Sequence, residues 1–92
     1  MRLDLFLKAS RLVLRRSVAK QLCDAGAVKI NGIAARASRE IAQGDEISIR
    51  RGSRTTVARV VAIPNTKQVS RAGAASLVEL VSDVKEQDPL LP

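Results

Sequence analysis

The chain has 92 residues, a net charge of +7, one cysteine, no histidine and a single aromatic residue, Phe6. The lack of histidine excludes Ser-His and Cys-His catalysis and histidine-ligated zinc, and one cysteine excludes a disulfide framework within the chain. No apolar run approaches the roughly 20 residues that cross a bilayer. Charges at Arg2, Asp4 and Lys8 argue against a secretion signal. We expect one small cytosolic domain with a tail.

The positive charge is concentrated in the first part of the chain. Residues 1–39 contain nine Lys or Arg residues against two acids, a net charge of +7, whereas residues 40–92 contain seven of each kind. This asymmetry indicates that one part of the fold binds a polyanion. Proteins that bind unpaired bases usually stack them on aromatic rings. Because this chain has only Phe6, we expect recognition of structured RNA by shape, phosphate and guanidinium groups.

Two short helices are predicted first. Over residues 2–10, Leu3, Phe6 and Leu7 fall on one face, and Asp4 lies in the first turn, where the helix dipole favours an acid. A second helix is expected from Ser17, or the residue before it, to about Ala25. Its expected buried stripe is Val18, Leu22 and Ala25, flanked by Ala19 and Cys23. Gly26 is expected to end it in a left-handed conformation.

The stretch RLVLRRSVAK, residues 11–20, carries four cations and no acid. Arg16 and Lys20 are four residues apart, so they project from the same helix face and repel each other unless an anion lies between them. We therefore expect these cations to lack acidic partners in the chain and to meet RNA phosphate.

Residues 28–63 predict strands. Val28 and Ile30 alternate with Lys29 before Asn31-Gly32, a strong hairpin signal. A turn at Gly44-Asp45 precedes a strand with Ile47 and Ile49 inward. A basic turn at 51–54 then leads into a strand over 55–63, which Pro64 ends.

The chain after Pro64 predicts less structure. Residues 64–76 are expected to be a loop or poorly ordered link, 77–81 a short strand or a helical turn, and the acidic chain from Ser82 a frayed tail. The whole predicts an α+β fold, with two short N-terminal helices on a small, mostly antiparallel sheet. We place a domain at 1–63 and a partly ordered extension with an acidic end at 64–92.

An ordered set of motifs carries a family resemblance. The pattern RLDxFLKxSRLxxRRxxAK spans residues 2–20, G-x-V-x-I-N-G spans 26–32, and G-D-E-I spans 44–47. This set resembles the S4 (S-four-type, or αL) RNA-binding domain, which occurs in tyrosyl-tRNA synthetases, pseudouridine synthases and small ribosome-associated proteins. Many members place Ser or Thr before the motif arginine. Here Arg15 occupies that position, so either Ser17 caps the second helix or the helix starts less tightly.

Among stand-alone members, the chain is similar to the RqcP group of bacterial ribosome-associated quality control and to a related heat-shock group that binds blocked large ribosomal subunits. The heat-shock group tends to have Trp in the first helix and a long basic C-terminal extension. Here the helix contains LFLKAS and the short tail is acidic, which favours the RqcP group. The resemblance implies binding to the large subunit carrying stalled peptidyl-tRNA, during alanine tailing of the nascent chain.

The resemblance further implies a non-enzymatic, cytoplasmic factor without cofactor or metal. Its expected partners are large-subunit ribosomal RNA, tRNA and a separate protein that recruits alanyl-tRNA, with no membrane, and the protein itself is expected to be a monomer. Roles in ribosome assembly, in general binding of structured RNA, or as a protein-interaction module with a basic face stay open. An enzyme is disfavoured because 92 residues leave no room for a pseudouridine synthase domain, and no Gly-rich cofactor loop follows a strand.

The candidate RNA-binding residues are Arg2, Lys8, Arg11, Arg15, Arg16, Lys20, Lys29, Asn31, Gly32 and Arg36. If about five phosphates are neutralised, log affinity falls with log salt at a slope of roughly −3.5 to −4.5.

The residues also allow structural interpretations. The Arg15, Arg16 and Lys20 cluster could be a solvated face and Arg2 could pair with an acid, while Asp4 is expected to be structural and to orient an arginine. Asn31-Gly32 is expected to form the turn first, and Cys23 to lie in the core. Whether the arginines at 50, 51 and 54 contact RNA or only solubilise a turn is open.

Overall fold

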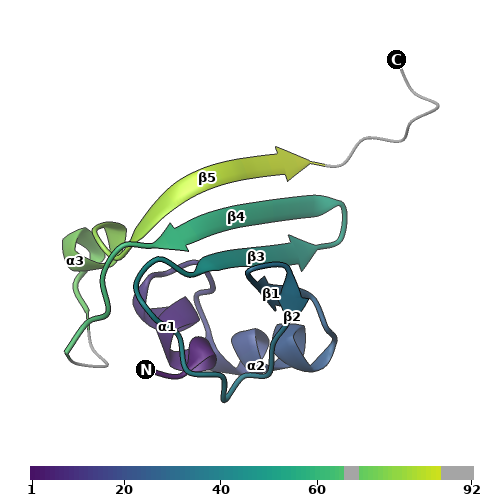
Figure 1. The fold of residues 1–92 in the computed structure, drawn as a ribbon, viewed down its shortest axis with the longest axis horizontal. Coiled ribbons are helices and arrows are strands. Elements are labelled where there is room, and N and C mark those ends of the chain that lie inside the picture. Colours follow the sequence, from purple (N-terminus) through teal and green to yellow (C-terminus); the bar gives the residue numbers. More distant parts are fainter. Residues whose placement is uncertain (66–68, 86–92) are drawn as a thin grey trace.

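The structure is a computed structural model that describes residues 1–65 and 69–85. These residues form a five-stranded antiparallel sheet of order β2-β1-β3-β4-β5, with helices beside it (Figure 1). In chain order the elements are α1 (Leu3–Ala9), α2 (Arg16–Asp24), β1 (Val28–Ile30), β2 (Ile33–Ala34), β3 (Glu46–Arg51), β4 (Arg54–Val60), α3 (Arg71–Ala75) and β5 (Val78–Lys85). The predicted α+β class is confirmed.

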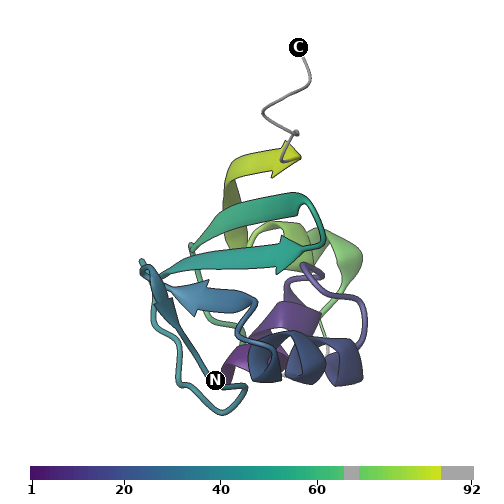
Figure 2. The same ribbon diagram turned by 90° about the vertical axis from the view of Figure 1, so that its right-hand side faces the viewer.

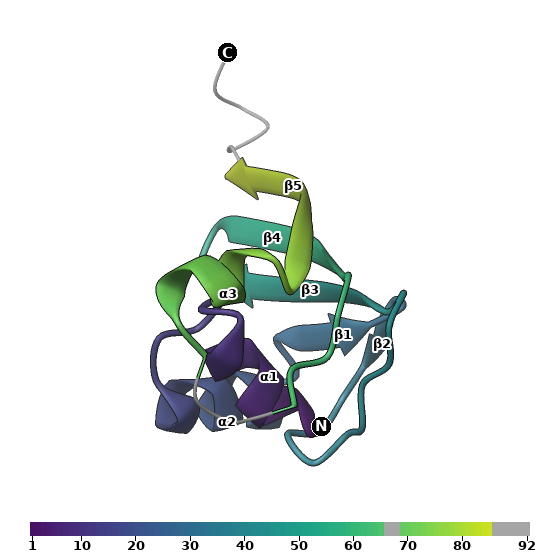
Figure 3. The same ribbon diagram turned by 90° about the vertical axis from the view of Figure 1, so that its left-hand side faces the viewer.

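The core lies between the sheet and the two N-terminal helices, which cover one face (Figures 2 and 3). Leu3, Phe6 and Leu7 of α1 are fully buried, as their spacing predicted, and they share one core cluster with Ile47 and Ile49 of β3. Phe6 therefore presents no ring to solvent. Any binding of bases at the surface has to do without aromatic stacking within the described residues.

The two ends of α2 differ in how they are fixed. At the C-terminus Gly26 has a φ of 73°, its N–H donates to Cys23 O and the N–H of Ala27 donates to Leu22 O. These two bonds form a Schellman motif, which confirms the predicted helix stop. At the N-terminus the capping position is Arg15, without a side-chain capping bond. The possibility that Ser17 caps the helix is wrong, because the helix already begins at Arg16.

The buried stripe of α2 is also rotated from the prediction. Ala19 and Cys23 are the buried residues, whereas Val18 and Leu22 are only half-buried and Ala25 is exposed. Val18, Ala19, Leu22 and Cys23 are all apolar, so periodicity alone does not fix the centre of the buried face. The small side chains of Ala19 and Cys23 allow α2 to approach α1 closely, and the larger ones pack at the margin.

The β1–β2 hairpin turns at Asn31-Gly32, as predicted. Both residues have positive φ, 51° and 85°, which is the requirement of a type I′ turn. The Asn31 side chain also ties the turn to the start of β3: its Oδ1 accepts from Glu46 N at 2.9 Å, and its Nδ2 donates to Asp45 Oδ1 at 3.1 Å. Asn31 is thus first of all a structural residue.

Replacing Asn31 by Ala is expected to lower the free energy of unfolding by about 1–2 kcal/mol, since two hydrogen bonds are lost and alanine tolerates the left-handed conformation poorly. Urea unfolding followed by circular dichroism measures this. Gln43→Ala, at an exposed position in the connection before β3, is the control and should change stability by less than about 0.5 kcal/mol. Equal stability of the two variants would contradict the structural role of Asn31.

The C-terminal part is more regular than predicted. β4 ends at Val60, before the predicted end at Ile63, because the N–H groups of Val61 and Ala62 leave the ladder and donate to Leu77 O at 2.8 and 3.2 Å. The expectation of only a loop over 64–76 is wrong for 71–75. That segment is α3. At its N-terminus the N–H of Gly73 donates to the side-chain oxygen of Ser70 at 3.0 Å.

Residues 78–81 belong to a strand rather than a helical turn, and Leu77 lies in the turn just before it. β5 continues to Lys85 and pairs with β4 from Arg54 to Val60, so the frayed tail expected from Ser82 does not begin there. The pairing of β4 with β5 shifts register between Val57 and Ala58. This irregularity interrupts the alternation of inward and outward side chains along the strands. The acidic end, residues 86–92, lies outside the described residues. The division of the chain after residue 63 stays a prediction, although β5 joins the same sheet.

Candidate nucleic-acid interface

A buried carboxylate organises the basic surface on α1 and α2. Asp4 is completely buried, and its two oxygens face two arginines: Arg16 Nε donates to Oδ2 at 3.0 Å, and Arg2 Nε lies 3.3 Å from Oδ1. The arginine side chains keep 40% and 43% of their surface exposed. Asp4 therefore anchors one edge of each guanidinium from inside the domain, while the rest of the fork faces solvent.

This geometry changes the charge balance inferred from sequence. The expected role of Asp4 in orienting an arginine is confirmed, and so is the alternative that Arg2 pairs with an acid. The expectation that Arg16 lacks an acidic partner is wrong. Asp4 lies twelve residues away in sequence and reaches Arg16 only because α1 packs against α2. The two arginines with one acid still carry a net charge of +1.

Arg11 occupies a position that normally favours glycine. It follows α1 with a φ of 60°, and its N–H donates to Lys8 O at 3.0 Å. A left-handed conformation costs a non-glycine residue about 1–2 kcal/mol. Such strain is found preferentially at functional sites. Arg11 is exposed, so its guanidinium is available at the surface despite this backbone cost.

The other cations of the helices are exposed. Lys8 lies in the last turn of α1, Arg15 immediately before α2, and Lys20 one turn after Arg16. Beside Arg15 is a hollow of about 190 Å³, lined by Val13, Leu14, Val18 and Arg51 as well. The helical part of the candidate site thus has a dense set of cations at one helix start, with apolar surface next to it.

The hairpin residues form a separate group. Lys29 alternates with the buried Val28 and Ile30, so it projects from the sheet face opposite the core, and it lines a hollow of about 310 Å³ with Arg50 and Thr55. Lys29 therefore does not lie on the same side of the domain as the cations of α1 and α2. Gly32 and Arg36 are also exposed, at the turn and after β2 respectively. Strand alternation explains this separation, because neighbouring residues point to opposite faces.

Cys23 is the only cysteine and lies in the core, as expected. Burial raises the pKa of its thiol, and the carboxylates of Asp4 and Asp24 raise it further. The folded protein thus keeps the thiol neutral to higher pH than the unfolded chain does.

We expect iodoacetamide to alkylate Cys23 at least about tenfold more slowly in the folded protein than in urea, since the thiolate is the reactive form and the folded thiol is buried. The same raised pKa predicts that the thiol's contribution to stability is fully present below about pH 8.5 and falls above it, because the unfolded thiol loses its proton first. Mass spectrometry and urea unfolding at several pH values measure both. Equal alkylation rates in the two states would contradict the burial.

Other classes of site are not visible in the described residues. Within 1–65 and 69–85, no cluster of three or more His, Cys, Asp or Glu side chains could hold a metal ion. No helix in this part of the chain is both long enough and apolar enough to cross a membrane.

Comparison with known proteins identifies the family. Residues 1–47 match the S4 domain. The chain is 34% identical to a Streptococcus pneumoniae protein named RQC P-site tRNA stabilizing factor over 88 residues, covering 96% of this chain and 98% of the relative. It is 40% identical over 90 residues to a protein of the same name from Halalkalibacterium halodurans, covering 98% and 96%. The chain belongs to the S4 domain family and to the RQC P-site tRNA stabilizing factors.

The structural comparison agrees with this assignment. The trimeric structure of heat shock protein 15 from Vibrio cholerae superposes with a TM-score of 0.79 and 27% identity, over 89% of this chain and 82% of that one. The resemblance inferred from the motifs at 2–20, 26–32 and 44–47 is thereby confirmed, both for the stabilizing factors and for their heat-shock relative. The similarity to the stabilizing factors extends beyond residue 47, through most of the sheet.

Proposed function

We propose that this protein is a non-enzymatic RNA-binding factor that binds the large ribosomal subunit carrying stalled peptidyl-tRNA and supports alanine tailing of the nascent chain. The observation that carries RNA binding is the buried Asp4, which fixes Arg2 and Arg16 at the surface of an S4 domain. The quality-control role is supported by the near full-length similarity to proteins named RQC P-site tRNA stabilizing factor.

The proposed contact has two parts. Arg2, Lys8, Arg11, Arg15, Arg16 and Lys20 are its cations on α1, α2 and the loop between them, and Lys29, Asn31, Gly32 and Arg36 form its hairpin part. Guanidinium forks bind phosphate bidentately, and A-form RNA is recognised by shape, phosphate and 2′-hydroxyl. Because Phe6 is buried, this mode suits the surface better than stacking of unpaired bases.

The proposal includes further partners. A separate protein would recruit alanyl-tRNA on the same subunit, while this chain, acting as a monomer in the cytoplasm without cofactor or membrane contact, would hold the tRNA and ribosomal RNA in place. Ribosome assembly and binding of acidic proteins by the basic face are the competing functions.

Crosslinking in cells, followed by sequencing of the attached RNA, tests the proposal. We expect large-subunit ribosomal RNA and tRNA together, and we expect the protein to co-sediment with large subunits when stalled chains accumulate. Crosslinks to precursor ribosomal RNA would indicate assembly instead. A protein that stays at the top of a low-salt gradient under stalling conditions would overturn the proposal.

A further inference from the structure

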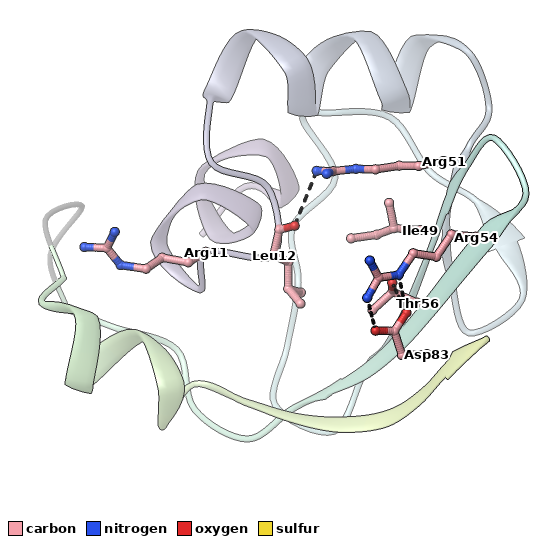
Figure 4. A pocket seen from close by; sticks show the side chains of 7 residues that line it. All are labelled: Arg11, Leu12, Ile49, Arg51, Arg54, Thr56 and Asp83. Carbon is pink, nitrogen blue, oxygen red and sulfur yellow. Dashed lines mark hydrogen bonds and ion pairs between the residues drawn. The ribbon is translucent and has the colours of Figure 1, made fainter. Parts of the chain in front are cut away.

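A third hollow lined by cations lies between the end of the β3–β4 hairpin and the loop after α1 (Figure 4). Its volume is about 240 Å³, and Leu12 and Ile49 line it together with Arg51, Arg54 and Asp83. Arg51 and Arg54 extend from their strands toward the space beside Leu12, whereas Arg11, which also lines the hollow, points away from them (Figure 4). Arg51 and Arg54 lie outside residues 1–47, the S4 match.

The two arginines face each other across the hairpin. Arg51 and Arg54 are direct partners in the antiparallel register, and the next pair on that face is Ile49 with Thr56. Because Ile49 is buried, Arg51 and Arg54 continue the core face of the sheet out into solvent. Like charges directly opposite each other in a sheet are destabilising. An anion bound between them would remove this repulsion.

The described acid in this hollow, Asp83, balances only one of the arginines. Arg54 Nε donates to Asp83 Oδ1 at 2.7 Å, a second guanidinium nitrogen donates to Oδ2, and the hydroxyl of Thr56 donates to Oδ1 at 3.1 Å. This pair uses two of the five N–H donors of Arg54. The ion pair therefore holds the side chain in place and leaves another edge of the guanidinium for a ligand.

Arg51 is held more loosely. One guanidinium nitrogen donates to Leu12 O at 3.4 Å, a long hydrogen bond. Arg51 also lines the neighbouring hollow that contains Arg15, Leu14 and Val18. Arg51 therefore lies between the hairpin hollow and the cations at the start of α2. One polyanion could contact both groups of cations.

We propose that Arg51 and Arg54 form a second RNA phosphate site on the β3–β4 hairpin, beside the surface on α1 and α2. The ligand is a backbone phosphate of structured RNA, bound by two guanidinium groups, with the half-buried Leu12 as apolar surface next to the ribose. This inference rests on the proposed RNA binding and extends its surface into the sheet beyond the S4 match. It also assigns a function to a turn that the sequence left undecided.

Arg51→Gln tests the site with little disturbance, because the Arg54–Asp83 pair stays intact. We would measure binding to salt-washed large ribosomal subunits and to an A-form RNA duplex at several salt concentrations. Losing one phosphate contact should reduce the slope of log affinity against log salt by about 0.7–0.9 and lower affinity in 0.1 M salt roughly five- to eightfold. Arg71→Gln on α3 is the matched control, with the same net charge and an unchanged slope expected.

A triple variant, Arg51→Gln/Arg54→Gln/Asp83→Asn, removes both arginines without leaving Asp83 unpaired and has the same net charge as the control. It should bind more weakly than Arg51→Gln. Circular dichroism and thermal unfolding confirm that each variant is folded, and if the triple variant is not, Arg51→Gln alone decides. If both bind RNA like Arg71→Gln while Arg16→Gln/Lys20→Gln weakens binding, the hairpin site is refuted and the proposed function stands. If Arg16→Gln/Lys20→Gln also binds normally, the proposed function fails with it.

Discussion

Replacing the buried Asp4 by Asn is expected to weaken RNA binding about tenfold, although the change makes the protein more positively charged. Asp4 holds Arg2 and Arg16 through contacts of 3.3 and 3.0 Å, and it is too deeply buried to meet RNA itself. Without the carboxylate both arginines lose their anchor and must be ordered on binding, at about 0.5–1.5 kcal/mol for each side chain. The fall in affinity therefore measures orientation rather than charge.

The same change should lower the free energy of unfolding by about 2 kcal/mol, since a hydrogen-bonded charge pair contributes about 1.5–3 kcal/mol and both arginines are partly exposed. Asp4 also accepts the N–H of Leu5 at 3.0 Å, which Asn can still do. Urea unfolding and RNA titration by fluorescence anisotropy measure the two effects. The loss of binding should be seen at urea concentrations well below the unfolding midpoint, where the protein is fully folded.

Asp24→Asn is the matched control for this experiment. Asp24 is the other acid among residues 1–39, is exposed, and ends α2, where the helix dipole disfavours a negative charge. Its replacement gives the same net charge as Asp4→Asn and should leave stability within about 0.5 kcal/mol and RNA affinity unchanged or slightly higher. If Asp4→Asn also binds RNA as tightly as the native protein, Asp4 does not position the arginines for binding.

The double change Arg16→Gln/Lys20→Gln is expected to lower affinity for large ribosomal subunits by about 100-fold in 0.1 M salt. If each residue neutralises one phosphate, the salt slope falls by about 1.4–1.8, which corresponds to a factor of roughly 25–60 at this salt, and lost hydrogen bonds add to it. The two side chains lie one turn apart on the exposed face of α2. Replacing Arg16 also removes its hydrogen bond to the buried Asp4, so the free energy of unfolding should fall by about 1–2 kcal/mol. Binding is therefore compared under conditions where circular dichroism shows the variant to be folded.

The control removes two arginines from other places. Arg59 lies near the opposite end of β4 from Arg54, with Glu46 and Glu79 at 3.9 and 3.8 Å, and Arg71 is exposed on α3. Arg59→Gln/Arg71→Gln has the same net charge as the test variant, and exposed ion pairs of this kind contribute only about 0–1 kcal/mol to stability. Equal loss of ribosome binding in both variants would mean that net charge alone drives association, without a defined surface on α2.

Local chemistry made several features predictable from sequence. The Asn31-Gly32 turn and the stop at Gly26 follow from backbone preferences of single residues, and their positive φ values confirm them. The buried face of α1 follows from three large apolar residues with one helical spacing. The S4 resemblance needed only the order and spacing of motifs over residues 2–47. All of these depend on interactions between residues close together in the chain, or on a pattern of residues along it.

Tertiary packing decided the rest. The packing of α1 against α2 decides which apolar residues of α2 face the core. The same packing brings Asp4 within hydrogen-bond distance of Arg16. β5 extends to Lys85 because β4 supplies its hydrogen-bond partners, and such pairing between distant segments leaves no local signal. Strand register decides on which side of the sheet Lys29 lies. It also places Arg51 opposite Arg54, in the hollow that Leu12 lines. The sequence by itself therefore determined the family and its cationic character, while only the packed fold determined which cations an internal acid holds in place and which share a surface.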